Sequence, residues 1–193
     1  RLSTEGLRLQ KDCDIYRTQT MQVIEDEIVP DEMVWMYGNH EDWLRQLLEK
    51  NPGLEGALNF ESLLGLSARG WTTVDQGDMA LLGKLTFVHG DRISGGEYVA
   101  KAAVIQYERS VRFGHFHSAQ SYTKHSPVST KLTKSGISVG CLCKKGPMYG
   151  KKAPNKWSQG FLFGYVFQDG SYTDYAPVIV DGKFAANGKV YRG

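Results

Sequence analysis

The fold class follows from the stretch Met33-Val34-Trp35-Met36-Tyr37-Gly38-Asn39-His40-Glu41. Its first five residues are apolar or aromatic and have no helical period, so they predict a short buried strand that ends at Gly38. An amphipathic helix is predicted directly afterwards, over residues 41–50, and Asn51-Pro52-Gly53 ends that helix. Open α/β folds place their chemistry at the ends of such buried strands. Asn39 and His40 are therefore candidate site residues.

The same alternation of strands and helices continues to about residue 120. Further buried strands are predicted at residues 85–88 and 111–113, and helices at residues 4–29, 60–66 and 97–109. Residues 71–84 are predicted to be turn-rich, with the clearest turn at Asp75-Gln76-Gly77-Asp78. Strands that alternate with helices in this way indicate an α/β sandwich.

Beyond residue 120 the pattern becomes β-rich. Residues 137–139 and 160–167 are strand-like, and Asp169-Gly170 and Asp181-Gly182 are strong hairpin signals. No repeat or low-complexity linker separates the two halves. We therefore predict a single domain over residues 1–193, with an α/β part at 1–120 and a β-rich part, containing a basic segment, at 121–193.

Composition indicates a globular protein in a reducing compartment. The chain is 41% hydrophobic and 23% charged, which is typical of soluble domains, and no apolar run reaches the roughly 18–20 residues of a membrane span. Three cysteines are too few for a disulfide framework, which favours the cytoplasm. Cys141 and Cys143 could bind metal, but their spacing is not that of a zinc site, so structural thiols are favoured.

Charge is distributed unevenly along the chain. Residues 1–108 carry 10 Lys and Arg against 18 Asp and Glu, a net charge of −8, whereas residues 109–168 carry 10 Lys and Arg and no acid, a net of +10. A surface of this kind attracts a polyanion or a phosphorylated substrate. The alternative is a solvated basic face that packs near the acidic half, and the charge pattern favours neither over the other.

Four of the five histidines follow the predicted strands. Asn39-His40 follows the first, His89 the second, and His115 and His117 the third, while His125 stands apart. Residues 115 and 117 can project to one side if that segment stays extended. Imidazole nitrogens and amide oxygens are good ligands for divalent transition metals. Separately satisfied histidines are the alternative, but their repeated position after strands favours a metal site.

These residues resemble a known family. Gly38-Asn39-His40-Glu41, Val88-His89-Gly90 and Gly114-His115-Phe116-His117 are similar in order and spacing to the last three motif blocks of the calcineurin-like metallophosphoesterases. The likeness covers roughly residues 30–120. The segment from Pro154 to Phe161 and the closing hairpins are also similar to phage and prophage members. The resemblance implies an α/β/β/α sandwich that hydrolyses phosphoesters.

The resemblance also implies roles for individual residues. Asn39, His89 and His115 would bind the second of two divalent transition metals (Mn, Fe, Zn or Ni), and His117 would bind the first. His40 would lie near the phosphate and act as acid or stabilise the transition state, with Glu41 orienting it. Two metals ~3.5–4 Å apart would activate water and neutralise the charge that develops on phosphorus.

The family's two opening blocks, Asp-x-His and Gly-Asp-x-x-Asp, have no match in residues 1–37. The resemblance therefore begins just after the second block, and the missing part would hold two strands and most ligands of the first metal. Whether these blocks are encoded upstream of Arg1, cleaved or absent stays open on the sequence. The residues given would bind metal poorly by themselves, because a carboxylate that bridges the two metals holds such a site together.

Several functions remain open on the sequence. Phosphodiester cleavage of nucleic acid is slightly favoured over a phosphomonoesterase or protein phosphatase, because Lys144, Lys145, Lys151 and Lys152 lie near Tyr149 and Trp157 and could steer a nucleic-acid backbone. Trp157 is at least as well explained as a core residue as by base stacking. A catalytically silent binding module with the same fold is the alternative from another class. A membrane partner is not expected.

Overall fold

The computed structural model describes residues 9–54, 56, 58–143 and 156–193. The chain forms two compact units, Arg1–Gln76 and Gly77–Gly193, and both combine helices with strands. The predicted α/β class is therefore confirmed, whereas the sandwich arrangement and the single domain stay predictions. Within the described part of the chain, no helix is both long and apolar enough to cross a membrane.

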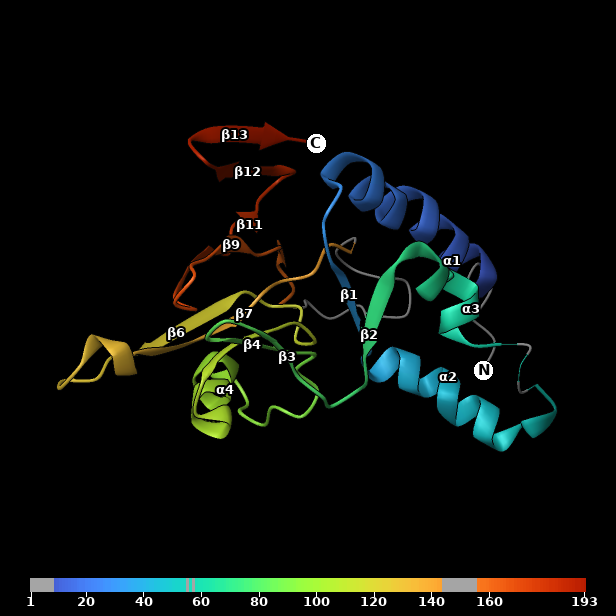
Figure 1. The fold of residues 1–193 in the computed structure, drawn as a ribbon, viewed down its shortest axis with the longest axis horizontal. Helices are drawn as coiled ribbons and strands as arrows, with labels where there is room; N and C mark the ends of the chain where they lie inside the picture. Colours follow the sequence, from blue (N-terminus) through green and yellow to red (C-terminus); the bar gives the residue numbers. More distant parts are fainter. Residues whose placement is uncertain (1–8, 55, 57, 144–155) are drawn as a thin grey trace. The chain divides into compact units, whose positions relative to one another are not determined.

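The first unit packs helices beside one parallel strand pair (Figure 1). Strand β1 (Met33–Met36) pairs with β2 (Trp71–Val74), and the helices are α1 (Leu9–Tyr16), α2 (Asn39–Lys50) and α3 (Phe60–Leu64). Helix α1 continues through two wider π-helical turns, η1 (Arg17–Met21) and η2 (Ile24–Ile28), and ends where Val29 adopts a left-handed conformation before Pro30. The predicted long helix is thus confirmed over residues 9–28.

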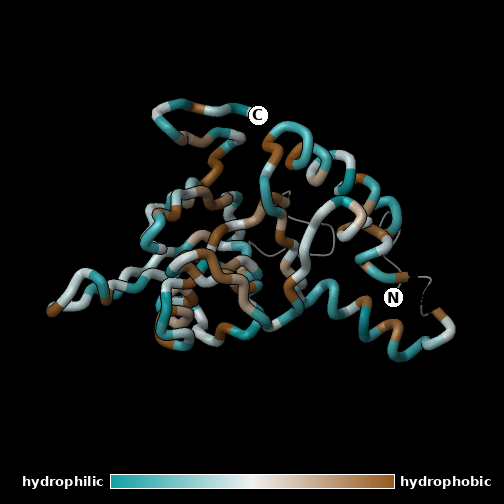
Figure 2. The backbone as a smooth tube through the Cα atoms, viewed as in Figure 1, coloured by the Kyte–Doolittle hydropathy of each residue, from teal (hydrophilic) through white to brown (hydrophobic). Residues whose placement is uncertain are grey.

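Amphipathic patterns build the core of this unit. Helix α2 alternates hydrophilic and hydrophobic segments (Figure 2), and its Leu44 is buried with Met21 and Leu66. The indole rings of Trp35 and Trp71 pack edge to face, with centroids 6.2 Å apart. One expectation is corrected: β1 is only half-buried, and the Val34 side chain is 47% exposed. An apolar run indicates a strand, but it cannot show how many neighbours cover that strand.

The second unit is organised around a five-stranded mixed sheet. Its order is β3 (Ala80–Leu82), β4 (Leu85–Val88), β5 (Ser110–Phe113), β7 (Lys134–Ser138) and β6 (Gln120–Lys124). Strands β4, β5 and β7 are parallel to their neighbours in this group, and the two edge strands are antiparallel. The turn predicted at Asp75-Gln76-Gly77-Asp78 is confirmed, with Gln76 and Gly77 in a turn. The rest of residues 71–84 is corrected, because one short strand lies on each side of this turn, β2 before it and β3 after it.

Helix α4 (Val99–Tyr107) covers one face of this sheet (Figure 1). Val99, Ala103, Val111 and Phe113 form the buried contact between helix and strands. Gly136 permits the close approach, because a Cβ atom there would lie 2.2 Å from the Ala100 carbonyl oxygen. The predicted strands at 85–88, 111–113 and 137–139 and the helix at 97–109 are confirmed, with shifts at their ends.

Short hairpins complete the second unit. Strand β8 (Gln159–Gly160) pairs with β11 (Val178–Ile179), β9 (Phe163–Val166) with β10 (Tyr172–Tyr175), and β12 (Lys183–Ala186) with β13 (Lys189–Arg192). Both predicted hairpin signals, Asp169-Gly170 and Asp181-Gly182, are confirmed as turns. A third turn at Asn187-Gly188 has positive φ at both residues, as its composition favours.

A buried ion pair joins the sheet to the β9–β10 hairpin. Arg112 of β5 and Asp174 of β10 form a salt bridge with side chains only 2% and 10% exposed. The Arg112 guanidinium also donates to the carbonyl and hydroxyl oxygens of Ser135, at 2.8 and 2.9 Å, and lies over the Tyr172 ring. Every polar group around this charge is therefore partnered, as burial of a charge demands.

Replacing Asp174 by asparagine should destabilise the protein by roughly 3–5 kcal/mol, because the Arg112 charge would stay buried without its counter-charge. Urea unfolding followed by circular dichroism measures this loss. Lys84→Gln is the matched control, because the salt bridge between Lys84 and Asp169 is exposed and 3.8 Å long. This substitution should lower the free energy of unfolding by no more than about 1 kcal/mol. Equal effects of the two substitutions would contradict this account of Arg112.

In the first unit, Glu25 of η2 is held by two partners. Its carboxylate accepts hydrogen bonds from Arg69 at 2.6 and 3.0 Å and from the Trp71 indole at 2.7 Å. Burial raises the pKa of the Glu25 carboxyl group, but the bonds from Trp71 and Arg69 and the Arg69 charge outweigh it. The pKa therefore lies below its ordinary value.

A depressed carboxyl pKa contributes stability that is present above the unfolded-state pKa of about 4.3 and is lost as pH falls through the folded value. Glu25→Gln should therefore destabilise the protein at pH 7 and lose most of that effect near pH 3. Urea titrations followed by tryptophan fluorescence at both pH values measure the difference. Glu49→Gln, in the exposed pair with Arg45, should change little at either pH. A Glu25→Gln effect that does not depend on pH would refute the linkage.

Candidate metal centre

The structure brings His89 and His115 together at one edge of the sheet. Strand β4 ends at Val88 and β5 at Phe113, and the parallel register pairs these two residues. The Gly114 amide then donates to the His89 carbonyl at 3.0 Å, which extends the pairing by one step. The Nδ1 atom of His115 lies 3.3 Å from the Nε2 atom of His89, and the ring centroids are 5.2 Å apart. This part of the predicted histidine cluster is therefore present.

Gly90 makes room for this pair. Its φ of +115° is a conformation that side chains rarely adopt, and a Cβ atom there would lie 3.3 Å from the Cβ of His115 and 3.2 Å from the Phe113 ring. The sequence shows Gly90 only as a residue after a strand. Its role in packing against His115 depends on the neighbouring strand, so sequence reasoning did not identify it.

Both histidines after β5 have left-handed backbone conformations. The φ angle is +61° at His115 and +56° at His117. The Phe116 amide donates to the Gly114 carbonyl at 2.7 Å, so residues 114–116 form a γ-turn centred on His115. The segment is therefore bent, and the condition for residues 115 and 117 to project to one side, an extended chain, is not met. Strain of this kind costs about 1–3 kcal/mol per residue and is concentrated at functional sites.

His117 has different neighbours from His115. Its ring packs edge to face against Trp157, with centroids 4.4 Å apart, while the His115 ring packs against Phe116. The Ser158 amide donates to the His117 carbonyl at 2.8 Å. The sequence did not decide whether Trp157 stacks on a base or belongs to the core. In the structure its ring lies against His117, a candidate metal ligand. Forty residues separate the two, and no local signal links them.

Asn39, His40 and Glu41 begin helix α2 in the first unit. Gly38 precedes the helix with an extended backbone, and its amide donates to the Glu41 carboxylate at 2.9 Å. His40 is exposed and stacks on the Trp43 ring at 4.5 Å. Glu41 thus caps the helix, and its predicted role in orienting His40 stays a prediction. The candidate residues lie in two units, so their convergence into one site also stays a prediction.

The His89–His115 pair fits two positions around one metal. Nitrogen donors about 2.0–2.1 Å from a metal and 3.3 Å from each other subtend an angle of about 105°, close to tetrahedral geometry. Within the described residues, no group of three or more His, Cys, Asp or Glu side chains is placed to hold a metal ion. The pair is therefore the part of the predicted ligand set that the structure assembles.

The remaining candidates are placed as follows. Cys141 and Cys143 form no disulfide with each other, and the Cys143 thiol donates a hydrogen bond to the Cys141 sulfur at 3.2 Å. Lys156 forms an exposed pair with Glu97 at 2.7 Å. The predicted nucleic-acid contacts Lys144, Lys145, Lys151 and Lys152 lie outside the described residues.

Because His115 has a left-handed conformation, we expect glycine to be more stable than alanine at this position, the reverse of the usual order. His115→Gly should be more stable than His115→Ala by about 1 kcal/mol, because only glycine adopts this backbone without strain. His89, whose φ is not positive, is the matched control, and there alanine should be the more stable by about 0.5–1 kcal/mol. Thermal and urea unfolding of the four variants measure both differences. The same order at both positions would show that residue 115 is not strained.

We compared the chain with protein-family models and with curated proteins. No protein-family model matches the chain, and no curated protein matches it. The resemblance to metallophosphoesterases therefore rests on the sequence motifs and stays a prediction.

Proposed function

We propose that this protein hydrolyses phosphoester bonds at a site with two divalent transition metals. The 3.3 Å approach of the His89 and His115 imidazole nitrogens at the ends of two parallel strands carries this proposal. The order and spacing of the Gly-Asn-His-Glu and histidine motifs support it. The strained γ-turn at His115 also supports the proposal, because backbone strain of this kind is concentrated at functional sites.

The layering of the second unit supports the proposed metallophosphoesterase sandwich. Helix α4 covers the sheet face that carries Val111 and Phe113. The opposite face carries Ser110 and Arg112, which contact Tyr172 and Asp174 of the β9–β10 hairpin. A β layer thus lies against one face of the sheet and a helix against the other, which is three of the four layers proposed.

In the proposed site, His89 and His115 would hold one metal and His117 would contribute to the other, while the part that the resemblance implies for Asn39, which belongs to the first unit, stays a prediction. The metals would supply a nucleophile at neutral pH and offset the negative charge that develops on the phosphoryl group. The γ-turn at His115 and the Gly90 contact hold the first histidine pair in position. Trp157 and the Ser158 amide do the same for His117.

His40 is proposed as the proton donor to the leaving oxygen. It lies in the first turn of α2, where the positive end of the helix dipole favours an anion such as phosphate. Stacking on Trp43 restricts rotation of its ring without covering it, since His40 remains exposed. A positioned imidazole of this kind contributes about 10²–10⁴-fold to a proton-transfer step.

Phosphodiesters of nucleic acid are the proposed substrates. The stretch 109–168 has ten basic residues and no acid, although two of its charges, Arg112 and Lys156, pair with Asp174 and Glu97. Of the six basic residues of this stretch that the structure describes, four are left for an anionic substrate, which is six minus those two.

His40→Ala should lower the hydrolysis of a generic phosphodiester by about 10²–10⁴-fold and leave bound metal unchanged, because its proposed role is proton transfer. His115→Ala should instead lower metal affinity by at least about 10–100-fold, the usual cost of losing even an indirect ligand contact. Elemental analysis and turnover of bis(p-nitrophenyl) phosphate by the full-length protein measure both effects.

His125→Ala is the matched control, because this histidine is exposed and follows β6, which runs antiparallel to β7 and so ends at the opposite edge of the sheet from His89 and His115. It should change neither metal content nor rate. A full-length protein that binds no transition metal and turns over neither this diester nor p-nitrophenyl phosphate would sink the proposal and favour a silent binding module. Faster turnover of the monoester than of the diester would agree with the proposed metal site but would make the protein a phosphomonoesterase.

A further inference from the structure

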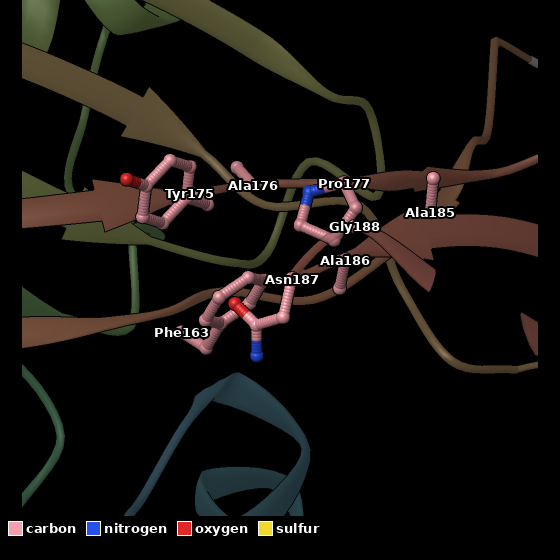
Figure 3. Close-up of a pocket in the computed structure, with 8 residues that line it drawn as sticks. All are labelled: Phe163, Tyr175, Ala176, Pro177, Ala185, Ala186, Asn187 and Gly188. Atoms are coloured by element: carbon pink, nitrogen blue, oxygen red, sulfur yellow. The ribbon is translucent and has the colours of Figure 1, made fainter. Parts of the chain in front are cut away.

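A pocket of about 550 Å³ lies between the β9–β10 and β12–β13 hairpins (Figure 3). Its volume is within the range of small-molecule sites. Phe163, Tyr175 and Pro177 line one part, and Ala186, Asn187 and Gly188 another. None of these residues belongs to the candidate metal centre, and the proposed hydrolysis does not use them.

Two aromatic rings form one wall of the pocket. Phe163 and Tyr175 are directly opposite each other across the β9–β10 pair, and their rings stack at 5.2 Å with an angle of 23°. Tyr175 is 50% exposed, so the stacked pair is not covered by the rest of the chain. A half-exposed ring held by stacking on its neighbour offers a planar ligand a surface at little cost in side-chain entropy. Such stacking binds nucleobases without selecting their sequence.

Asn187 adds a polar group to this aromatic wall. The Asn187-Gly188 turn, with φ angles of +50° and +72°, fixes the residue where β12 ends. Within the described part of the chain, the side-chain amide of Asn187 makes no hydrogen bond. An amide carries one donor and one acceptor side by side, which matches the edge of a nucleobase. The pocket thus combines a stacking surface with a hydrogen-bonding edge.

The β12–β13 hairpin also supplies positive charge. Lys183 is directly opposite Arg192 in the register, and Lys189 is opposite Ala186, which lines the pocket. All three basic side chains are exposed, and none forms an ion pair with another described residue. Like charges placed directly across a strand pair destabilise it. Residues 182–193 contain no acid, so an anion bound from outside would relieve this repulsion.

We propose that this pocket binds a base of single-stranded nucleic acid. The base stacks on the Phe163–Tyr175 wall and meets the Asn187 amide at its edge. Lys183 and Arg192, on one face of the β12–β13 hairpin, and Lys189, on the other, offer positive charge to the phosphates on either side of that base. An uncharged apolar ligand would use the rings but not these three cations. The inference concerns binding and does not depend on the metal centre. If the proposed hydrolysis also holds, the pocket is a second place, outside the metal centre, at which the nucleic-acid substrate is bound.

Fluorescence anisotropy of the full-length protein with a labelled single strand tests the aromatic wall. The probe is an oligodeoxyadenylate of about 12 nucleotides, within the ~4–16 that such sites cover, and EDTA is present so that metal binding has no influence. Tyr175→Ala should weaken binding by roughly 5- to 150-fold, the usual effect of losing one stacked base. Tyr175→Phe keeps the ring and should bind like the unmodified protein.

Tyr98→Ala is the matched control, because this tyrosine is 73% exposed and does not line the pocket. It should leave the affinity unchanged. Equal weakening by Tyr98→Ala and Tyr175→Ala would overturn the proposal. Absence of binding by the unmodified protein at low salt would overturn it as well, and because EDTA is present, that failure would leave the proposed hydrolysis untouched.

Salt dependence tests the charges separately. Replacing Lys183, Lys189 and Arg192 with glutamine should reduce the slope of log affinity against log salt by about 2, since each phosphate contact to a single strand contributes about 0.7. The control replaces three exposed lysines elsewhere, Lys11, Lys50 and Lys101, with glutamine and should leave the slope unchanged. Equal slopes for the two triple variants would show that the hairpin does not face the phosphates.

Discussion

The candidate site depends on the parallel pairing of β4 with β5. This register aligns Val88 with Phe113, so the residues that follow each strand emerge at the same edge. Without that register His89 and His115, which are 26 residues apart in the chain, would have no reason to meet. Helix α4 closes the crossover between the two strands and buries Val99 and Ala103 against them. The hydrophobic packing of α4 on β4 and β5 thus helps to keep the two strands in register, and with them His89 and His115 at the strand ends.

The second organising interaction is the buried pair of Arg112 and Asp174. It lies on the sheet face opposite α4 and holds the β9–β10 hairpin there, with Tyr172 bonded to Ser110 at 2.7 Å. A buried guanidinium accepts few arrangements, because each of its donors needs a partner. The ion pair therefore fixes where the β9–β10 hairpin lies on the sheet. The pocket described above is lined by Phe163 and Tyr175 of the same hairpin. The same pair removes one charge from the basic stretch that the sequence indicated as an anion-binding surface.

Strain and close packing are concentrated around the histidines after β5. Two left-handed residues, a γ-turn and the tight fit of Gly90 all occur within this small region. None of these features stabilises the fold, since each restricts the backbone at a cost. They persist because the flanking strands and α4 hold the ends of the segment. In the proposed metal site, a histidine pair already held in this way would lose less entropy when it binds the metal.

The sequence by itself determined the elements and the candidate residues. Apolar runs located β4 and β5, periodic apolar positions located α2 and α4, and the glycine turns located two hairpins, because each of these signals is local. The motifs likewise named His89 and His115. Only the tertiary structure decided that these two meet, that His117 lies against Trp157 and that Arg112 is buried rather than available to a ligand. Those contacts join residues 26 to 62 positions apart, and their geometry is set by strand register and packing, which no local pattern encodes.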